Sequence, residues 1–252
     1  AADIAVDILA IAAHPDDAEL GCGGSLLLAA RKGLHIEIAD LSAGEMSSRG
    51  TVVSRQIEAN NAARILGIKE RRNLGLPDSK IGENAPHSLS VIIQLIREAR
   101  PRIVLAPYWE DRHPDHEATG RLIKEACFFA GVTKIGEGEP FRPTRLFYYM
   151  LSYPFTPAFV LDISDVWERK MDAIRAYQTQ FGSSSEDGIR TAISEPGFLK
   201  LVEARAIWFG SMIGAAYGEP YYMSGPVPVA ELPNATASST YDKPLPPYTM
   251  FY

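Results

Sequence analysis

Short apolar segments alternate with longer amphipathic segments along the first half of the chain. The apolar segments are rich in Ile, Leu, Val and Ala, which is typical of strands that are buried on both faces. Strands are expected at residues 6–14, 35–42, 71–76 and 102–108, and helices at 23–33, 55–67, 88–100 and 114–131. This order predicts parallel β-α-β units, and therefore an α/β fold with a Rossmann-like, largely parallel sheet and helices on both faces.

The second half of the chain is less regular. Strands are expected at residues 144–151 and 158–164, and helices at 165–181 and 198–216. From about residue 225 to 252 the chain is rich in proline and has no period, which predicts an extended tail. We expect one domain over residues 1–252. It comprises a Rossmann-like core at about 5–132, a C-terminal extension of helices and strands at about 140–225, and the tail.

Two clusters of polar residues follow two of the predicted strands. His14, Asp16 and Asp17 come directly after the first strand, and His113, Asp115 and His116 come after the fourth. In a sheet of order 3-2-1-4 these two strands are neighbours at the point where the strand order reverses. Ligands bind there, beyond the carboxyl ends of the strands. We therefore expect both clusters to line one crevice.

Three residues of these clusters form the donor set of a catalytic metal site. His14 and Asp17 can supply two ligands from one turn, and His116 the third from the other cluster. Two imidazoles and one carboxylate with an open position for water suit catalytic Zn²⁺, and Fe²⁺ accepts the same donors. The pattern predicts a zinc site, with Fe²⁺ as the alternative metal.

The other three residues of the clusters have the chemistry of acid–base catalysis. Asp16 is not among the predicted metal ligands but lies next to them in the sequence. A free carboxylate beside a metal-bound water can act as a general base. His113 can act as a general acid or stabilise an oxyanion, and Asp115 can hold its ring in one tautomer. Together the two clusters predict metal-assisted hydrolysis.

A nucleotide-binding turn is the weaker alternative. The segment GCGGSL at 21–26 matches only the first two glycines of G-x-G-x-x-G, although Asp40 lies where a ribose-binding acid belongs. A pyrophosphate at this turn would meet Asp16, Asp17 and Glu19. Like charges at about 4 Å repel by roughly 1 kcal/mol even in water. A non-enzymatic Rossmann-like module that binds a sugar or nucleotide is therefore kept only as an alternative.

Composition and charge limit the partners and the cellular location that this chain can have. The net charge of −6 and a pI of about 5.4 argue against nucleic acid as a partner. No apolar run reaches the roughly 20 residues of a membrane span, and residues 1–14 lack the charged start of a signal peptide. The two cysteines, Cys22 and Cys127, are far apart in the chain and are expected to be reduced thiols. We expect a cytoplasmic protein.

The motifs AHPDD (13–17) and HPDH (113–116) resemble those of the zinc-dependent N-acetylglucosamine deacetylases of the PIG-L/LmbE-like superfamily. Further segments are similar to the branch that deacetylates N-acetylglucosaminyl-malate in bacillithiol biosynthesis. These segments lie at 48–67, 73–79, 105–116 and 176–191. The resemblance covers about residues 6–228 and implies the same ligands, base and electrophilic histidine that the residues themselves suggest.

The resemblance also implies two substrate-binding arginines. Arg55 matches an arginine of the active-site cleft, and Arg112 matches a position that meets the acidic aglycone. A guanidinium group suits a carboxylate such as that of malate. Relatives carry a tyrosine near the start of the last helix that is thought to stabilise the oxyanion, whereas this chain has Phe198 at that position.

The expected activity is zinc-dependent hydrolysis of N-acetylglucosaminyl-malate to glucosaminyl-malate and acetate, on a small-molecule substrate. The alternatives within the same chemistry are deacetylation of chitooligosaccharides or of another N-acyl sugar, and hydrolysis of the amide of a thiol conjugate. By resemblance we also expect a homo-oligomer, either a trimer or a hexamer.

Overall fold

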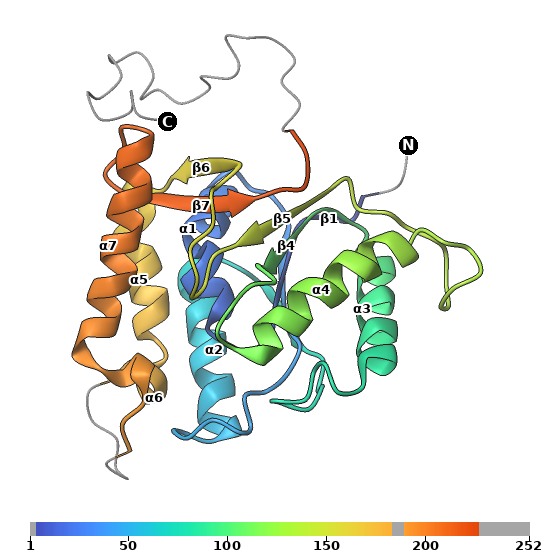
Figure 1. Cartoon of the computed structure of the whole chain (residues 1–252), viewed down its shortest axis with the longest axis horizontal. Helices are drawn as coiled ribbons and strands as arrows, with labels where there is room; N and C mark the ends of the chain where they lie inside the picture. Colours follow the sequence, from blue (N-terminus) through green and yellow to red (C-terminus); the bar gives the residue numbers. More distant parts are fainter. Residues whose placement is uncertain (1–3, 183–188, 227–252) are drawn as a thin grey trace.

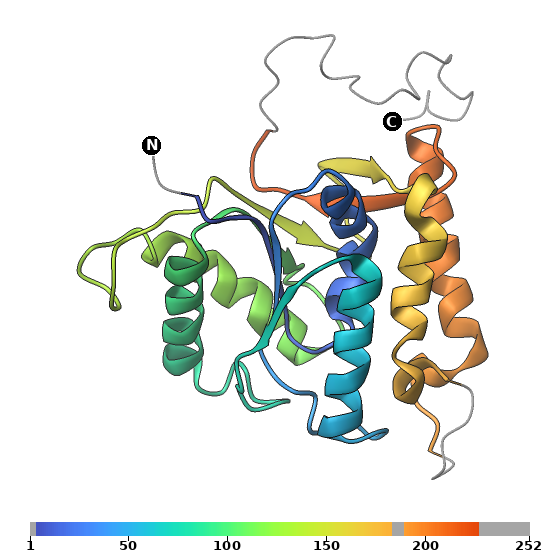
Figure 2. The same cartoon turned by 180° about the vertical axis from the view of Figure 1, so that it is seen from behind.

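In the computed structural model, residues 4–182 and 189–226 are described, and they form a seven-stranded sheet with helices on both faces (Figures 1 and 2). The strand order is β3-β2-β1-β4-β5-β7-β6. The strands are β1 (Val6–Ala12), β2 (Ile36–Asp40), β3 (Glu70–Asn73), β4 (Pro101–Pro107), β5 (Arg145–Tyr149), β6 (Phe159–Asp162) and β7 (Gly218–Tyr222). Strands β1 to β5 run parallel in the predicted 3-2-1-4 order, and β7 is antiparallel to both of its neighbours. The predicted fold class is confirmed.

The helices divide into two layers. They are α1 (Asp17–Arg31), α2 (Val52–Leu66), α3 (Ala85–Ala99), α4 (Pro114–Phe129), α5 (Trp167–Arg175), α6 (Gln178–Phe181) and α7 (Pro196–Met212), with 3₁₀ turns η1 (Ser164–Val166) and η2 (Ala192–Ser194). One apolar core contains residues of α1, α2, α5 and α7, and a second contains residues of α3 and α4 (Figure 1). Each core covers one face of the sheet.

The central strand β1 explains why the first apolar segment has no polar alternation. Ala10 and Ala12 belong to one core, whereas Leu9 and Ile11 belong to the other. Successive side chains of a strand point to opposite faces, and here both faces are covered by helices. A continuous apolar run is therefore the pattern that this position requires.

The first helix begins earlier than predicted. It was expected from residue 23, but α1 begins at Asp17, so Gly21 lies within it as well as Gly24. A side chain at Gly21 would overlap the ring of Tyr149, and one at Gly24 would overlap Ile163 and Glu219. These glycines let the helix lie close to the C-terminal half of the sheet, and they form no phosphate-binding loop.

The C-terminal half departs from the prediction in two further places. The helix expected at 165–181 is divided into α5 and α6. Strand β7 was not expected, and it contains Pro220, a residue that is uncommon in strand interiors. In the sheet, β7 pairs with β5 only at Tyr221 and Tyr222, beyond that proline.

The tail predicted at about residues 225–252 lies largely outside the described residues. Within the described part of the chain, no helix is both long and apolar enough to cross a bilayer.

Candidate metal centre and active site

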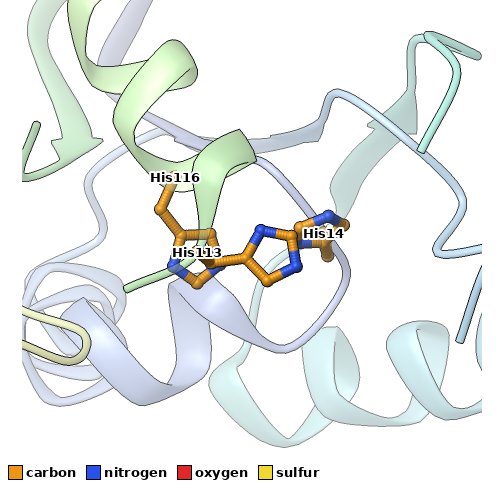
Figure 3. Close-up of side chains that lie close together, drawn as sticks. All are labelled: His14, His113 and His116. Carbon is orange, nitrogen blue, oxygen red and sulfur yellow. The ribbon is translucent and has the colours of Figure 1, made fainter. Parts of the chain in front are cut away.

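The strand order brings the two polar clusters together. Strands β1 and β4 are hydrogen-bonded neighbours, so their carboxyl ends share one edge of the sheet. The ring centroid of His14 lies 4.8 Å from that of His113 and 5.5 Å from that of His116 (Figure 3). Two segments that are far apart in the sequence thus contribute to one group of side chains, of which His14 and His116 are buried and His113 is half-buried.

Asp17 lies between the two imidazoles that were predicted as metal ligands. Nε2 of His116 is 3.1 Å from Oδ1 of Asp17, and Nδ1 of His14 is 3.5 Å from Oδ2 of the same carboxylate. All three residues are buried. One nitrogen of each ring and both oxygens of Asp17 therefore face a common region.

The other nitrogen of each imidazole contacts a second carboxylate. Nδ1 of His116 lies 2.9 Å from Asp111. Nε2 of His14 lies 3.1 Å from Asp78 and 3.3 Å from Asp115. Carboxylates in this position fix the tautomer and orientation of a metal-binding histidine, and they leave the opposite nitrogen as the donor to the metal.

The charges around the site favour a cation. Burial by itself lowers the pKa of His14, but hydrogen bonds to Asp115, Asp17 and Asp78 outweigh it and raise this pKa well above its ordinary value. Burial opposes the same shift in His116, whose pKa is raised to about 9 by the charge of Asp17 and the hydrogen bond to Asp111. The carboxylates hold positive charge on both rings, and a divalent ion between these donors can replace those protons.

His14 also belongs to two other sets of neighbouring donors. The donor atoms of His14, His113 and His116 all lie within 4.8 Å of one another, as do those of His14, Asp78 and Asp115. In the predicted set, both imidazoles face Asp17, and each uses its remaining nitrogen for a different carboxylate. The donor chemistry of His14, Asp17 and His116 therefore fits Zn²⁺ or Fe²⁺.

Asp16 is held apart from the two imidazoles in a strained conformation. Its φ of 108° and ψ of −26° lie in the left-handed region, which residues other than glycine rarely adopt. Its Oδ2 accepts a hydrogen bond of 2.8 Å from Arg55, which also donates to the carbonyl of Pro15. Burial raises the pKa of Asp16 to about 7 and Arg55 opposes the shift. The guanidinium of Arg55 thus contacts the predicted base.

His113 and Asp115 are adjacent, but the Asp115 carboxylate does not hold the His113 ring as expected. The backbone N–H of Asp115 donates to Nδ1 of His113, at 3.2 Å, and so caps α4. The carboxylate accepts hydrogen bonds from the N–H groups of Ser79 and Ile81 and contacts His14. Burial lowers the pKa of His113, and the neighbouring His14 and His116 lower it further. With Nδ1 accepting, the neutral ring carries its proton on Nε2.

A cavity of about 650 Å³ opens onto these residues. Arg112 lines it and is exposed, whereas Arg55 is buried against Asp16. Phe198 also lines the cavity, and its ring stacks on Phe181 with 5.7 Å between centroids. The structure therefore places both predicted substrate-binding arginines on the cavity wall, in different surroundings.

Asp78 and Asp111 are polar residues of the site to which the sequence analysis gave no role. Asp111 stands five positions before His116, and Asp78 follows the short edge strand β3. Their positions near the two clusters and near a strand end were available signals. Spacing alone, however, does not show which carboxylate meets which imidazole.

Asp40 has no free oxygen for a ribose. Arg71 donates to both of its carboxylate oxygens, at 2.7 and 2.8 Å, and Asp40 is 2% exposed. Since the glycine-rich segment is helical as well, both features behind the dinucleotide alternative have structural roles instead.

Comparisons with known proteins find similarity to deacetylases of amino sugars. The profile of the PIG-L family, described as GlcNAc-PI de-N-acetylase, matches residues 9–127, which include both clusters. The diacetylchitobiose deacetylase of Thermococcus kodakarensis is 31% identical over 231 residues, covering 84% of this chain and 80% of that protein. A Bacillus subtilis protein named "Probable N-acetyl-alpha-D-glucosaminyl L-malate deacetylase 2" is 29% identical over 69% of this chain and 82% of its own length.

The fold has a similar counterpart among solved structures. The crystal structure of the conserved protein TT1542 from Thermus thermophilus aligns with a TM-score of 0.82 at 40% identity. The alignment covers 90% of this chain and 98% of that one. Similarity in sequence and in fold thus extends well beyond the two histidine motifs.

Proposed function

Because this chain belongs to the PIG-L family, we propose that it removes the acetyl group from an N-acetylglucosaminyl substrate, and specifically from N-acetylglucosaminyl-malate. The chain is a deacetylase, and the proposal concerns its substrate and the roles of its residues. One observation carries the mechanism: His14 and His116 face the Asp17 carboxylate, while Asp16 lies beside them without contacting either imidazole.

His14, Asp17 and His116 would hold the metal. A Zn²⁺ or Fe²⁺ ion bound there would act as a Lewis acid toward the acetamide carbonyl and would make a water molecule more acidic. Asp16 accepts the proton of the water that attacks the carbonyl carbon, and it passes this proton to the amine nitrogen as the C–N bond breaks. The products are acetate and the free amine of the sugar.

Arg55 and His113 support this step in different ways. Arg55 holds the Asp16 carboxylate through a hydrogen bond of 2.8 Å, so it orients the base in addition to lining the cavity. His113 is favoured as a neutral ring with a proton on Nε2, because burial and two neighbouring imidazoles lower its pKa. Of its two predicted roles, this supports donation of a hydrogen bond to the developing oxyanion rather than proton transfer.

Arg112 is the residue that would select the malate group. It is exposed on the cavity wall, where a guanidinium can bind a carboxylate in two parallel hydrogen bonds. A second candidate substrate is a chitooligosaccharide, because the diacetylchitobiose deacetylase matches more of this chain, at higher identity, than the malate enzyme. That substrate offers Arg112 no carboxylate.

Acetate release distinguishes the candidates. N-acetylglucosaminyl-malate, diacetylchitobiose and N-acetylglucosamine are compared with the zinc-loaded enzyme, with and without a chelator. We expect the malate substrate to have the highest kcat/KM and Arg112→Ala to lower it at least tenfold, while Arg64→Ala, an exposed arginine on α2, has no effect. Equal cleavage of diacetylchitobiose and indifference to Arg112→Ala would favour the second candidate. Full activity after complete metal removal would contradict the metal-assisted mechanism.

The oligomeric state is a separate prediction. We propose a trimer or a hexamer, and light scattering can test it.

A further inference from the structure

The cavity continues beyond the metal ligands along α1. Asp17, Leu20 and Gly21 all line it, and their spacing of three and four residues places them on one face of the helix. Val202 and Ala206 of α7 line the same cavity. The space next to the predicted ligands thus leads into a region bounded by α1 and α7, which we call the inner arm.

Six apolar side chains line the inner arm: Leu20, Met150, Ile193, Phe198, Val202 and Ala206. Arg205 of α7 also lines the cavity, and its guanidinium donates to the carbonyls of Leu151 and Ser152. Met150 is 3% exposed and Ala206 is 6% exposed, so this end of the cavity reaches into the interior. At the rim, in contrast, Arg112 and Ser79 are exposed and polar. The cavity therefore has a polar entrance, and its inner wall is largely apolar apart from Lys170, Arg205 and Glu219.

Two charged residues at the inner end are already satisfied. Lys170 donates to Glu219, at 2.6 Å, and to the carbonyl of Leu20, at 3.0 Å. Glu219 also accepts the N–H groups of Gly24 and Ser25 within α1, at 2.7 and 2.8 Å. The Lys170–Glu219 pair links α1 to β7. Because the carboxylate oxygens of Glu219 already accept these hydrogen bonds, a further hydrogen bond to a ligand would add little binding energy.

Phe198 adds to the apolar character of the arm. Its ring lies nearly parallel to that of Phe181, at 4°. A phenylalanine offers no hydroxyl to a sugar or to an oxyanion. The wall here suits a hydrocarbon group.

We propose that the inner arm binds acyl chains longer than acetyl, so that the enzyme also cleaves longer N-acyl glucosamines in addition to the proposed N-acetylglucosaminyl substrate. The proposal rests on the proposed function and adds N-acyl glucosamines with longer, unbranched acyl chains to its substrate class. A sugar and an acidic aglycone carry hydroxyl and carboxylate groups that need polar partners, and the rim supplies these. The acyl chain is the substituent on the other side of the scissile bond, and an apolar arm stabilises it. The bond chemistry is unchanged: water adds its oxygen to the acyl carbon, the C–N bond breaks, and the nitrogen gains the proton.

A chain-length series tests the proposal. N-acetyl-, N-butanoyl- and N-hexanoyl-glucosamine are compared by amine release with the metal-loaded enzyme. Each buried methylene should raise kcat/KM about fourfold until the arm is filled. Ala206→Phe and the milder Val202→Phe should lower the ratio of hexanoyl to acetyl hydrolysis at least tenfold. Ala204→Phe, on an exposed position of the same helix, should leave that ratio unchanged.

Binding of sodium hexanoate provides a readout that does not depend on turnover. By calorimetry, hexanoate should bind more tightly than acetate, and Ala206→Phe and Val202→Phe should remove the difference. If acetyl hydrolysis is normal but the rates do not rise with chain length, the acyl arm is refuted and the proposed deacetylation stands. If hexanoate binding depends on residues 202 and 206 but no N-acyl glucosamine is cleaved, the arm is supported and the proposed substrate is refuted. If hexanoate binds no better than acetate and no substrate is cleaved, both are refuted.

Discussion

Nε2 of His116 lies 3.1 Å from Oδ1 of Asp17, although the two residues lie in the first turns of helices that follow different strands. The contact depends on β1 and β4 being neighbours in register, with Ala10 opposite Leu105. A shift of one residue between these strands would move the two helix starts apart by about 3.3 Å, more than a shared coordination sphere tolerates. The sheet register therefore sets the geometry of the proposed metal site.

Asp111 should determine metal affinity without binding the metal. Its Oδ1 lies 2.9 Å from Nδ1 of His116 and orients that ring toward Asp17. We expect Asp111→Asn to weaken zinc binding by about 10- to 100-fold, measured by competition with a chromogenic chelator. Glu110→Gln, a change of the exposed neighbouring acid, is the matched control. Unchanged affinity in Asp111→Asn would show that His116 is not oriented through this contact.

Asp16→Asn should separate metal binding from catalysis. Asparagine tolerates the left-handed backbone of this position and cannot accept the proton, so the variant should fold and bind zinc normally. We expect kcat to fall by about 10²- to 10⁴-fold, measured by acetate release together with the metal content. Asp172→Asn, at an exposed position of α5, serves as the control. A variant with near-normal turnover would remove Asp16 from the role of base.

Lys170→Met should destabilise the whole protein. Lys170 and Glu219 are both buried, and Nζ of Lys170 lies 2.6 Å from Oε1 of Glu219. Removing the ammonium group therefore leaves a buried carboxylate without its counter-charge. We expect a loss of about 3–5 kcal/mol in the free energy of unfolding in urea. Lys200→Met, at an exposed position of α7, should have little effect. The double variant Lys170→Met/Glu219→Gln should recover part of the loss, because it removes both charges, and a double variant that is still less stable would contradict this account.

The two cysteines should be unreactive in the folded protein. Burial raises the pKa of Cys22 well above its ordinary value and that of Cys127 to about 12. Because the thiolate is the reactive form, we expect no rapid reaction with a disulfide reagent at pH 8 and full reaction of both thiols after unfolding in urea.

The raised pKa values of the two thiols also mean that the unfolded chain loses these protons first as the pH rises. Stability contributed by the neutral thiols is therefore lost above about pH 9. Cys22 is buried and Cys127 is half-buried, so rapid reaction of Cys22 in the native protein would contradict this account.

Local patterns were sufficient for the core of the fold. Apolar runs at 6–14 and 102–108, with helical periodicity between them, predicted strands buried on both faces, and β1 and β4 meet that description. They were insufficient for β7, because Pro220 argues locally against a strand that its long-range pairing with β5 and β6 establishes. They also misplaced the start of α1, because the need for Gly21 arises from Tyr149, which is distant in the sequence.

By itself, the sequence determined the residue types of the site and their places at the ends of two strands. Both follow from short-range patterns, since a strand end and the cluster after it are contiguous in the chain. Only the tertiary structure decided that Asp78 and Asp111 orient the two imidazoles, that the Asp115 carboxylate contacts His14 rather than the His113 ring, and that an apolar arm continues from the site. Most of these features join side chains from separate segments of the chain, and their contacts depend on how the helices pack on the sheet, which no local pattern records.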